Sequence, residues 1–389
     1  MDNRRTFLKT AAVFTAASYQ RVLGANDRVR IAGIGTANRG TLLLGLALKC
    51  PGVELVAVCD VYGPHRKALK EKLAPAADEF GDHRQVLDRK DIDAVVVATP
   101  DHWHVPITID AVEAGKDVYV EKPVGHSIED GERLLETMAG NKQIVQVGYQ
   151  QRSWPHFQAA REYVASGKLG KITLVLASWY QDYNRTRADV PRYDLSQLDW
   201  KRFCGTAPDQ QFVPLRYQRW RWFWDFGGGH LTDLYSHYGD VIHWCMDSYS
   251  PISAQAMGSR HVMPEYECPD AIIASYEYPG FNVVHTGALN CVLEAGNIVF
   301  RGGNAMMKLN RDGFAVYEER TVPYEKTFLP EPVTSMKSAA DGTPFHMQNF
   351  VDSVRSRKPP NAGVENAVAS ARAAHLGNLA YRRGARIEA

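Results

Sequence analysis

The chain has 389 residues, of which 45% are hydrophobic and 23% charged, a composition typical of a globular protein long enough for two domains with sizeable cores. Its 45 Lys and Arg residues nearly balance its 44 Asp and Glu residues, and the net charge of +1 argues against a nucleic-acid partner or a basic membrane-binding face. We therefore expect a small-molecule partner. The six cysteines contain no C-x-x-C pair, so neither a zinc ribbon nor a thioredoxin-type redox motif is indicated. No segment after the N-terminal region reaches the roughly 18 apolar residues of a membrane span, so no membrane span is expected.

The N-terminal residues 1–25 resemble a twin-arginine export signal. Arg4 and Arg5 precede the weakly apolar residues 10–18, and Leu23-Gly-Ala25 offers a small-residue cleavage site. A basic amphipathic helix is the alternative interpretation. Because a twin-arginine signal carries folded proteins, the sequence predicts a periplasmic protein that is exported with its cofactor already bound.

Residues 28–60 have the pattern strand, glycine turn, helix, strand. The strand 28–33 breaks into Gly33-Ile-Gly35-Thr-Ala-Asn-Arg39-Gly40, an apolar helical pattern follows, and a second strand ends in Asp60. Such glycines let backbone N–H groups approach a pyrophosphate at a helix N-terminus, and an acid about 20 residues further on binds the adenosine ribose hydroxyls. The third glycine, Gly40, falls two residues later than G-x-G-x-x-G requires, so we expect a longer turn around a dinucleotide.

The next unit is a buried parallel strand, 93–100, followed by a helix, 106–115. Between them we expect a loop, Asp101-His-Trp-His104, at the carboxyl end of the strand, where it would contact nicotinamide or substrate. The His-x-His spacing is compatible with a metal, but no third ligand is nearby, so no metal site is predicted.

The stretch Asp117-Val-Tyr-Val-Glu-Lys-Pro-Val124 ends an apolar, β-branched run with a charged pair and a proline. Because proline restricts the preceding residue to extended conformations, Lys122 is held at the exit of the strand, where ligands bind in open α/β sheets. A surface lysine after an ordinary strand is the alternative. With a helix predicted over 128–139 and a strand over 143–148, the alternation of strands and helices indicates a doubly wound domain.

After Gly148 the pattern changes, and we place the domain boundary there. A helix is predicted up to about Ser166 and a strand over 170–178, whereas residues 179–226 are dense in aromatic and arginine side chains without a clean period. Aromatic platforms beside Arg and Asp hydrogen-bonding groups suit sugar rings. The alternative is a long packed loop with ordinary core aromatics.

A triple glycine, residues 227–229, leads into a predicted helix that runs to Trp244. Asp233, His237 and Asp240 lie at positions i, i+4 and i+7 of it, and therefore on one face. A histidine titrates near neutrality, and a carboxylate one turn away orients its ring and stabilises its charged form. The arrangement predicts a general base for an alcohol proton, with a structural histidine as the alternative.

The remaining chain predicts a largely antiparallel sheet and two helices. Glycine and proline separate six strands, at 252–259, 271–278, 282–289, 297–301, 305–309 and 313–317. A loop is expected over 321–343, and helices over 346–357 and 364–382.

These motifs together resemble the glucose-fructose oxidoreductase, inositol dehydrogenase and rhizopine-catabolism (Gfo/Idh/MocA) family, over essentially all of the chain after the signal. The matching pieces are Gly33-x-Gly35, Asp60, Ala98-Thr-Pro100 with the His-x-His pair, Glu121-Lys-Pro123, Gly227-Gly-Gly-x-x-x-Asp233-x-x-x-His237, and Asn349-Phe with Lys358-Pro359. The resemblance implies NAD or NADP and sugar or polyol substrates. It assigns catalysis to Lys122, Asp233 and His237, with His237 as base and Lys122 orienting the reacting hydroxyl. The substrate-site motifs of the family's exported NAD-dependent glycosidases are not found.

The predicted fold class is α/β plus α+β, in three segments. A signal peptide, 1–25, precedes an N-terminal Rossmann domain, 26–148, and a C-terminal open-faced, mainly antiparallel sheet domain, 149–389. A homo-oligomer, dimer or tetramer, is expected.

The predicted site residues fall into three groups. The catalytic residues are Lys122, Asp233 and His237. The cofactor-binding residues are Gly33, Gly35, Thr36, Asn38, Arg39, Gly40, Asp60, Thr99, Pro100, His102, His104, Glu121 and Lys122. The substrate-binding residues are Tyr149, Gln150, Arg152, Trp222 and Asp240.

The expected reaction is hydride transfer between a hydroxyl-bearing carbon of a sugar, polyol or glycoside and a tightly bound nicotinamide. NAD is expected rather than NADP, because Asp60 would repel a 2′-phosphate and Val61-Tyr62 follows it, although Arg66 is nearby. A redox-neutral glycosidase, lyase or epimerase acting through a transient keto-sugar is the alternative among enzymes. A non-catalytic sugar or dinucleotide sensor is the alternative of another class.

Overall fold

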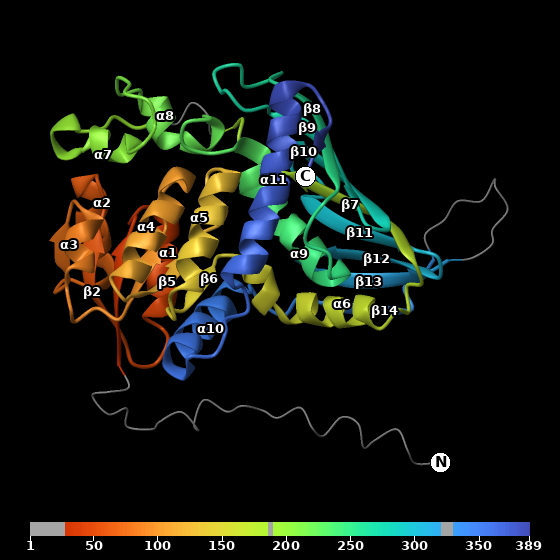
Figure 1. Ribbon diagram of the computed structural model, residues 1–389, viewed down its shortest axis with the longest axis horizontal. Helices are drawn as coiled ribbons and strands as arrows, with labels where there is room; N and C mark the ends of the chain where they lie inside the picture. Colours follow the sequence, from red (N-terminus) through yellow and green to blue (C-terminus); the bar gives the residue numbers. More distant parts are fainter. Residues whose placement is uncertain (1–27, 186–189, 320–329) are drawn as a thin grey trace, which may run out of the picture.

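The computed structural model of the protein describes residues 28–185, 190–319 and 330–389 (Figure 1). The predicted export signal, residues 1–25, lies outside these ranges. In the described ranges no helix is long and apolar enough to cross a membrane. The chain forms two sheets, with helices on both faces of the first and on one face of the second.

The first sheet is parallel throughout, in the order β3-β2-β1-β4-β5-β6. Its strands are β1 (Val29–Ile34), β2 (Val53–Cys59), β3 (Asp78–Phe80), β4 (Ala94–Val97), β5 (Asp117–Val120) and β6 (Val145–Val147). Its helices are α1 (Asn38–Ala47), α2 (Gly63–Leu73), α3 (His83–Leu87), α4 (Asp101–Glu113) and α5 (Ile128–Ala139). The central strands are rich in valine and buried on both faces, which requires the two layers of helices. The strand order reverses between β1 and β4, which opens a ligand crevice at their carboxyl ends.

Two sequence predictions for this half were wrong in detail. Residues 101–104, predicted as a loop, form the first turn of α4, because Pro100 is an extended N-cap and the acidic Asp101 suits a helix N-terminus. Pro106, predicted to begin the helix, lies inside it. The sequence analysis also did not predict α2, β3 and α3. Their segments are short or polar and carry little hydrophobic periodicity.

The second sheet has nine strands in the order β14-β13-β12-β11-β7-β10-β9-β8-β15. They are β7 (Ile172–Tyr180), β8 (Ser253–Ser259), β9 (Ala271–Tyr278), β10 (Phe281–Ala288), β11 (Gly296–Gly302), β12 (Ala305–Asn310), β13 (Gly313–Glu318), β14 (Thr334–Lys337) and β15 (Ile387–Glu388). All neighbours are antiparallel except β7 and β10. The predicted fold class is therefore confirmed.

One face of this sheet is more exposed than the other. Burial alternates along β9 and β10, and the outward side chains include Met257 and Ile273. The expected homo-oligomer stays a prediction. The strand β14 lies inside residues 321–343, which were predicted to be a loop. It is a short edge strand with mostly exposed residues, so its sequence shows no alternation of apolar and polar residues that would predict a strand.

The remaining helices connect the two sheets. They are the 3₁₀ turn η3 (Gln150–Ser153), α6 (Pro155–Ala165), α9 (Ser236–Met246) with a preceding π-helical turn, η6 (Leu231–Tyr235), α10 (Thr343–Ser356) and α11 (Val364–Arg383). Figure 1 shows α11 between α5 and the second sheet. Side chains of α10 and α11, such as Phe350 and Val364, belong to the cores of the first sheet. The C-terminal residues thus pack on both halves, while the predicted boundary at 148/149 stays a prediction.

Residues 190–226, which we call the roof segment, lie over the carboxyl edge of the first sheet above α2 and α4 (Figure 1). The segment contains η4 (Leu195–Gln197), α7 (Trp200–Cys204), α8 (Pro214–Gln218) and η5 (Trp220–Trp222). His102 Nε2 and Trp103 Nε1 both donate to the Phe203 carbonyl, at 2.8 and 2.9 Å. Arg202 pairs with Asp82 at 3.2 Å. These bonds fasten the roof segment to the first sheet.

Candidate active site

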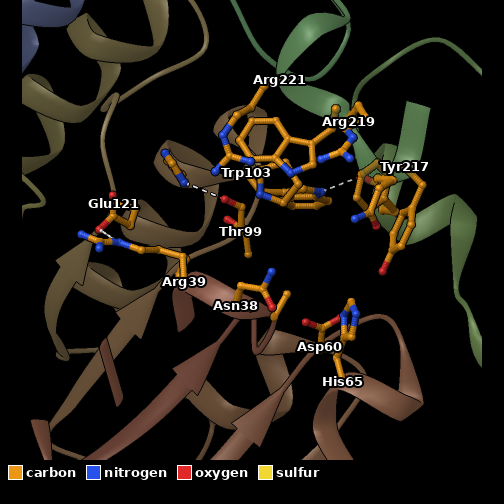
Figure 2. Close-up of a pocket in the computed structure, with 18 of the residues that line it drawn as sticks. Asn38, Arg39, Asp60, His65, Thr99, Trp103, Glu121, Tyr217, Arg219 and Arg221 are labelled. Atoms are coloured by element: carbon orange, nitrogen blue, oxygen red, sulfur yellow. Dashed lines mark hydrogen bonds and ion pairs between the residues drawn. The ribbon is translucent and has the colours of Figure 1, made fainter. Parts of the chain in front are cut away.

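A cavity of about 790 Å³ lies between the strand ends of the first sheet and the roof segment. It crosses the ends of four neighbouring strands, from Asp60 after β2 to Lys122 after β5, and it includes His237 on α9. Figure 2 shows Asp60 on the first-sheet side, with Tyr217 and Arg219 of the roof segment across from it. A cavity of this span can hold an extended two-ended ligand.

One end of the cavity is built around Asp60. Its Oδ2 accepts from the Thr36 backbone N–H at 2.8 Å, and its Oδ1 accepts from the Tyr62 N–H at 2.9 Å. Burial opposes ionisation, but His65 and these N–H groups hold the pKa of Asp60 below its ordinary value. Tyr62 and Tyr193 meet edge to face 5.6 Å apart beside it. A charged acceptor next to aromatic rings suits a ribose and its attached base.

The backbone of the glycine turn packs closely against its neighbours, as the motif predicts. Gly35 has φ +85°, and a Cβ on it would lie 2.6 Å from the Ala98 carbonyl carbon. A Cβ on Gly40 would lie 1.9 Å from the Gly35 carbonyl oxygen, so α1 begins close against the turn. Ala37 contributes no capping side chain, which leaves the first N–H groups of α1 for an anion. These residues fit the diphosphate of a dinucleotide.

Three predicted cofactor residues of the glycine turn lie behind the cavity instead of lining it. Gly33 lies against α1, where a Cβ would meet Leu44 at 2.3 Å. Thr36 is buried and orients Asp60 through its N–H and its hydroxyl, at 2.8 and 3.2 Å. Gly40, described above, likewise contributes by close packing. The other members on α1, Asn38 and Arg39, line the cavity.

The two histidines of the His-x-His pair have different surroundings. His104 lines the cavity with Thr99 and Pro100, and its ring nitrogens lie 2.8 and 2.9 Å from the carbonyl oxygens of Pro123 and Thr99. His102, predicted to contact the cofactor, is buried outside the cavity and binds the roof segment, because residues two apart on a helix point in different directions. Over the three described ranges, no group of three or more His, Cys, Asp or Glu side chains could hold a metal ion.

Lys122 and Asp233 meet at the other end of the cavity. Lys122 Nζ lies 2.8 Å from Asp233 Oδ1, and Arg221 Nε donates to the same oxygen at 3.0 Å. Burial opposes ionisation of Asp233, but Lys122 and Arg221 hold its pKa at about 2. The carboxylate is thus ionised at neutral pH and fixes the lysine ammonium at the cavity wall.

His237 lines the cavity with its ring stacked on Trp179, centroids 5.6 Å apart and planes at 17°. It is 6% exposed, and its Nδ1 has no hydrogen-bond partner in the described part of the chain. Burial, and then the positive charges of Lys122, Arg311 and Arg39, lower the pKa of His237 well below its ordinary value. The imidazole is therefore neutral at physiological pH and able to accept a proton.

The expectation that a carboxylate orients His237 was wrong. Asp233 lies in the π-helical turn η6 and pairs with Lys122, and Asp240 is fully buried against Arg152, whose Nε and Nη2 donate to it at 2.8 and 2.9 Å. The three residues thus do not form a single functional face. Asp240 and Arg152, predicted to bind substrate, are a structural pair outside the cavity.

The other predicted substrate residues divide between cavity and core. Gln150 and Trp222 line the cavity. Tyr149 is fully buried outside it, with its ring 6.3 Å from that of His237 and edge to face with it. It therefore supports the histidine from behind. The catalytic and binding roles themselves stay predictions.

Sequence reasoning missed Arg221 and Arg311 as residues of this cavity. Arg221 lies within the aromatic stretch Trp220-Arg-Trp222, where nothing distinguishes it from its neighbours. Arg311 lies in the tight turn between β12 and β13, where an exposed arginine is the usual expectation. Only the tertiary structure brings this turn to the end of α9.

Comparison with known proteins gives matches over both halves of the chain. Residues 28–149 match the GFO/IDH/MocA oxidoreductase family, NAD-binding Rossmann fold, and residues 157–307 match the GFO/IDH/MocA C-terminal domain. Inositol 2-dehydrogenase of Salmonella typhimurium is 29% identical over 168 residues, which are 43% of this chain and 48% of that protein. A glycosyl hydrolase family 109 protein of Saccharopolyspora erythraea is 36% identical over 121 residues, 29% of this chain and 26% of that protein.

These matches cover about half or less of the length of the curated relatives. Among solved structures, scyllo-inositol dehydrogenase from Lactobacillus casei with bound NAD(H) and scyllo-inositol has a TM-score of 0.68 at 19% identity, over 93% of this chain and 99% of that chain. That likeness shows a shared fold.

Proposed function

Because the chain belongs to the Gfo/Idh/MocA family of NAD-binding oxidoreductases, we propose that it transfers hydride between a hydroxyl-bearing carbon of a sugar, polyol or glycoside and a tightly bound NAD. The observation that carries the proposal is a neutral, buried His237 in the same cavity as a fixed Lys122 ammonium. The cavity continues from this pair to Asp60, which suits a dinucleotide lying across the strand ends.

The proposed roles follow from protonation states. NAD, when bound, supplies the hydride acceptor. His237, neutral because burial and nearby cations disfavour its charged form, accepts the proton of the reacting hydroxyl. Lys122, held by Asp233, donates a hydrogen bond to the same oxygen and stabilises the negative charge that develops on it.

The direct test incubates the NAD-loaded protein with a panel of sugars, polyols and glycosides while nicotinamide absorbance is followed. Reduction of NAD by at least one member supports the dehydrogenase. If bound NAD stays oxidised with every compound, and labelled hydride never exchanges into it, the proposal fails and a sensor becomes the better interpretation.

A redox-neutral glycosidase is the second candidate, favoured by the similarity to a family 109 glycosyl hydrolase. In such a reaction a transient keto-sugar forms and the cofactor returns to its starting state. Release of the aglycone from a chromogenic glycoside, without a net change in nicotinamide absorbance, would separate this reaction from net oxidation.

We predict a preference for NAD over NADP. The Asp60 carboxylate is ionised and already accepts hydrogen bonds on both oxygens, so a 2′-phosphate beside it would be repelled. Arg66, the nearby basic residue, is engaged with the Asp60 carbonyl and lies 4.0 Å from Glu79. We expect NAD to bind at least about tenfold more tightly, and Asp60→Ser to narrow that ratio. Tighter binding of NADP by the unmodified protein would contradict the assignment.

We also predict that the cofactor is retained through purification. The roof segment contributes Tyr193 and Tyr217 to the Asp60 end of the cavity, and we expect its attachments at Phe203 and Arg202 to slow the release of a dinucleotide. Protein purified without added nucleotide should carry close to one NAD(H) per chain after extensive dialysis. Arg202→Ala, which removes the partly exposed ion pairs with Asp82 and Asp199, should release NAD(H) several-fold faster.

An exposed arginine that lies outside the roof segment and does not line the cavity provides the control. Arg133→Ala, on α5, should retain the cofactor as the unmodified protein does. Protein that emerges empty and turns over only with excess free NAD would contradict retention.

Export on the twin-arginine route remains part of the proposal, on the strength of Arg4, Arg5 and the following apolar run. Outside the cytoplasm no pool of free NAD is expected to replace a spent molecule. The cofactor would therefore stay bound, and each cycle would return it to its starting redox state, through a second substrate or a redox-neutral reaction. An empty purified protein would thus also weaken the periplasmic location and favour a conventional cytoplasmic dehydrogenase.

A further inference from the structure

The end of the cavity near His237 carries more positive than negative side chains. The charged residues that line it are Arg39, Lys122, Arg221, Arg311, Glu121 and Asp233. Glu121 pairs with Arg39 at 2.7 Å, and the single carboxylate of Asp233 serves two cations. The neighbouring Asp101 does not line the cavity, and burial raises its pKa well above the ordinary value, so it does not offset the excess. Positive charge therefore remains for a ligand.

Arg311 is the one of these four cations that has no carboxylate partner among the described residues. Its guanidinium carbon lies 4.8 Å from the centre of the Trp179 ring, and Trp179 also stacks on His237. The indole therefore positions the guanidinium close to the predicted base. Arg311 Nε is buried without a hydrogen-bond partner. The nearest carboxylate influence comes from the exposed Asp341, but no carboxylate within the described ranges lies within the 4.0 Å of an ion pair with the guanidinium. Removing a cation from water without pairing it with an anion costs free energy, so we expect this arginine to have a function at the cavity.

Two other arginines with little exposed surface in the described ranges, Arg152 and Arg216, have carboxylate partners. Arg152, which is 3% exposed, makes a bidentate pair with Asp240 at 2.8 and 2.9 Å. Arg216 pairs with both Asp225 and Glu267. These pairs are complete within the protein. Arg311 differs because its anion has to come from outside, and the cavity beside it is where a substrate would lie.

We propose that the substrate carries an anionic group, a carboxylate in the first place, that binds to Arg311 with support from Arg221. A guanidinium matches a carboxylate through two parallel N–H···O bonds. Arg221 is held at the cavity by Asp233 and by the Trp220 ring, 4.2 Å from its guanidinium carbon. The inference rests on the proposed function and specifies its substrates as uronic acids and their glycosides, in preference to neutral sugars. A phosphate ester shares this chemistry and is included in the test.

The experiment measures binding to the NAD-loaded protein by calorimetry, with matched pairs of ligands: glucuronate and glucose, galacturonate and galactose, glucose 6-phosphate and glucose. We expect each uronate to bind at least about tenfold more tightly than its neutral counterpart, the size of one charge-assisted bidentate contact. In Arg311→Met, which keeps an unbranched side chain over Trp179, the ratio should fall to within about threefold of unity. Arg386→Met, which removes an exposed arginine beside β15, should keep the preference.

Equal binding of acidic and neutral ligands, or a preference that survives Arg311→Met in a folded protein, would overturn the anion site. Tighter binding of the 6-phosphate than of the uronates would keep the site and replace carboxylate by phosphate. Hydride transfer, followed with the same pairs, separates this inference from the proposed function. Arg311-dependent uronate binding without reduction of NAD removes the dehydrogenase alone, whereas turnover of neutral sugars without acid preference removes the anion site alone.

Discussion

Replacing His237 by alanine is expected to lower the turnover number by roughly two orders of magnitude or more, the scale of general acid–base catalysis. Its ring lines the cavity, stacks on Trp179 and is kept neutral by burial and by the adjacent cations. It lies far along the cavity from Asp60, so the affinity for NAD should stay nearly unchanged. Turnover and NAD affinity, measured on the same preparation, test the two halves of this expectation.

The pH profile supplies a second readout of the same base. The charged and titratable groups near His237 are Lys122, Arg39, Arg311, Asp233, Tyr149 and Tyr238. A base acts while unprotonated, and the pKa of His237 is lowered from 6.5. The acid limb of kcat/KM should therefore lie below pH 6.5, with no loss of rate between neutrality and that value. Because Arg311 contributes to the lowering, Arg311→Met should move the acid limb upward.

A control on the same helix tests whether the loss is specific. His243→Gln changes another buried histidine of α9, which contacts Tyr278 outside the cavity, and the folded fraction should turn over at a near-normal rate. If His237→Ala kept near-normal turnover while a deuterium isotope effect showed hydride transfer to be rate-limiting, His237 would not be the base.

The fold was largely predictable because most of its elements carry a clear hydrophobic pattern. The valine-rich strands β4 and β5 have the pattern typical of buried parallel strands, and β9 and β10 have the alternation typical of half-buried antiparallel strands. The family resemblance is confirmed by the matches over both halves. Elements without such patterns were missed, such as β3 and β14, whose residues are mostly exposed.

Site residues were predictable where the strand order of the parallel sheet alone determines where they lie. Asp60 and Lys122 each follow a parallel strand, and parallel strands of one sheet end at the same edge, so both were expected at one crevice. Arg311 was not predictable, because its approach to the cavity depends on how the second sheet lies against α9. The π-helical turn η6 was also hidden, since regular helix geometry would have placed Asp233 beside His237.

Replacing Lys122 by alanine is also expected to lower turnover by roughly two orders of magnitude or more while leaving NAD binding nearly intact. The Lys122 ammonium is held 2.8 Å from Asp233 Oδ1, so its position requires no reorganisation during the reaction. A hydrogen bond to an oxygen that gains negative charge is strongest in the transition state. Its loss should therefore lower kcat more than it weakens substrate binding. Single-turnover rates of NAD reduction measure that step directly.

The variant Asp233→Asn separates the charge of Lys122 from its placement. The amide keeps the shape of the carboxylate but no longer fixes the ammonium or offsets its charge, so turnover should fall while remaining above that of Lys122→Ala. Lys67→Ala, which removes an exposed lysine of α2, controls for loss of one positive charge and should leave turnover unchanged. A Lys122→Ala protein that reduces bound NAD at near-normal single-turnover rates would show that the ammonium does not contact the reacting oxygen. The contact between Lys122 and Asp233 would then be structural, and His237 would have to act without this hydrogen-bond donor.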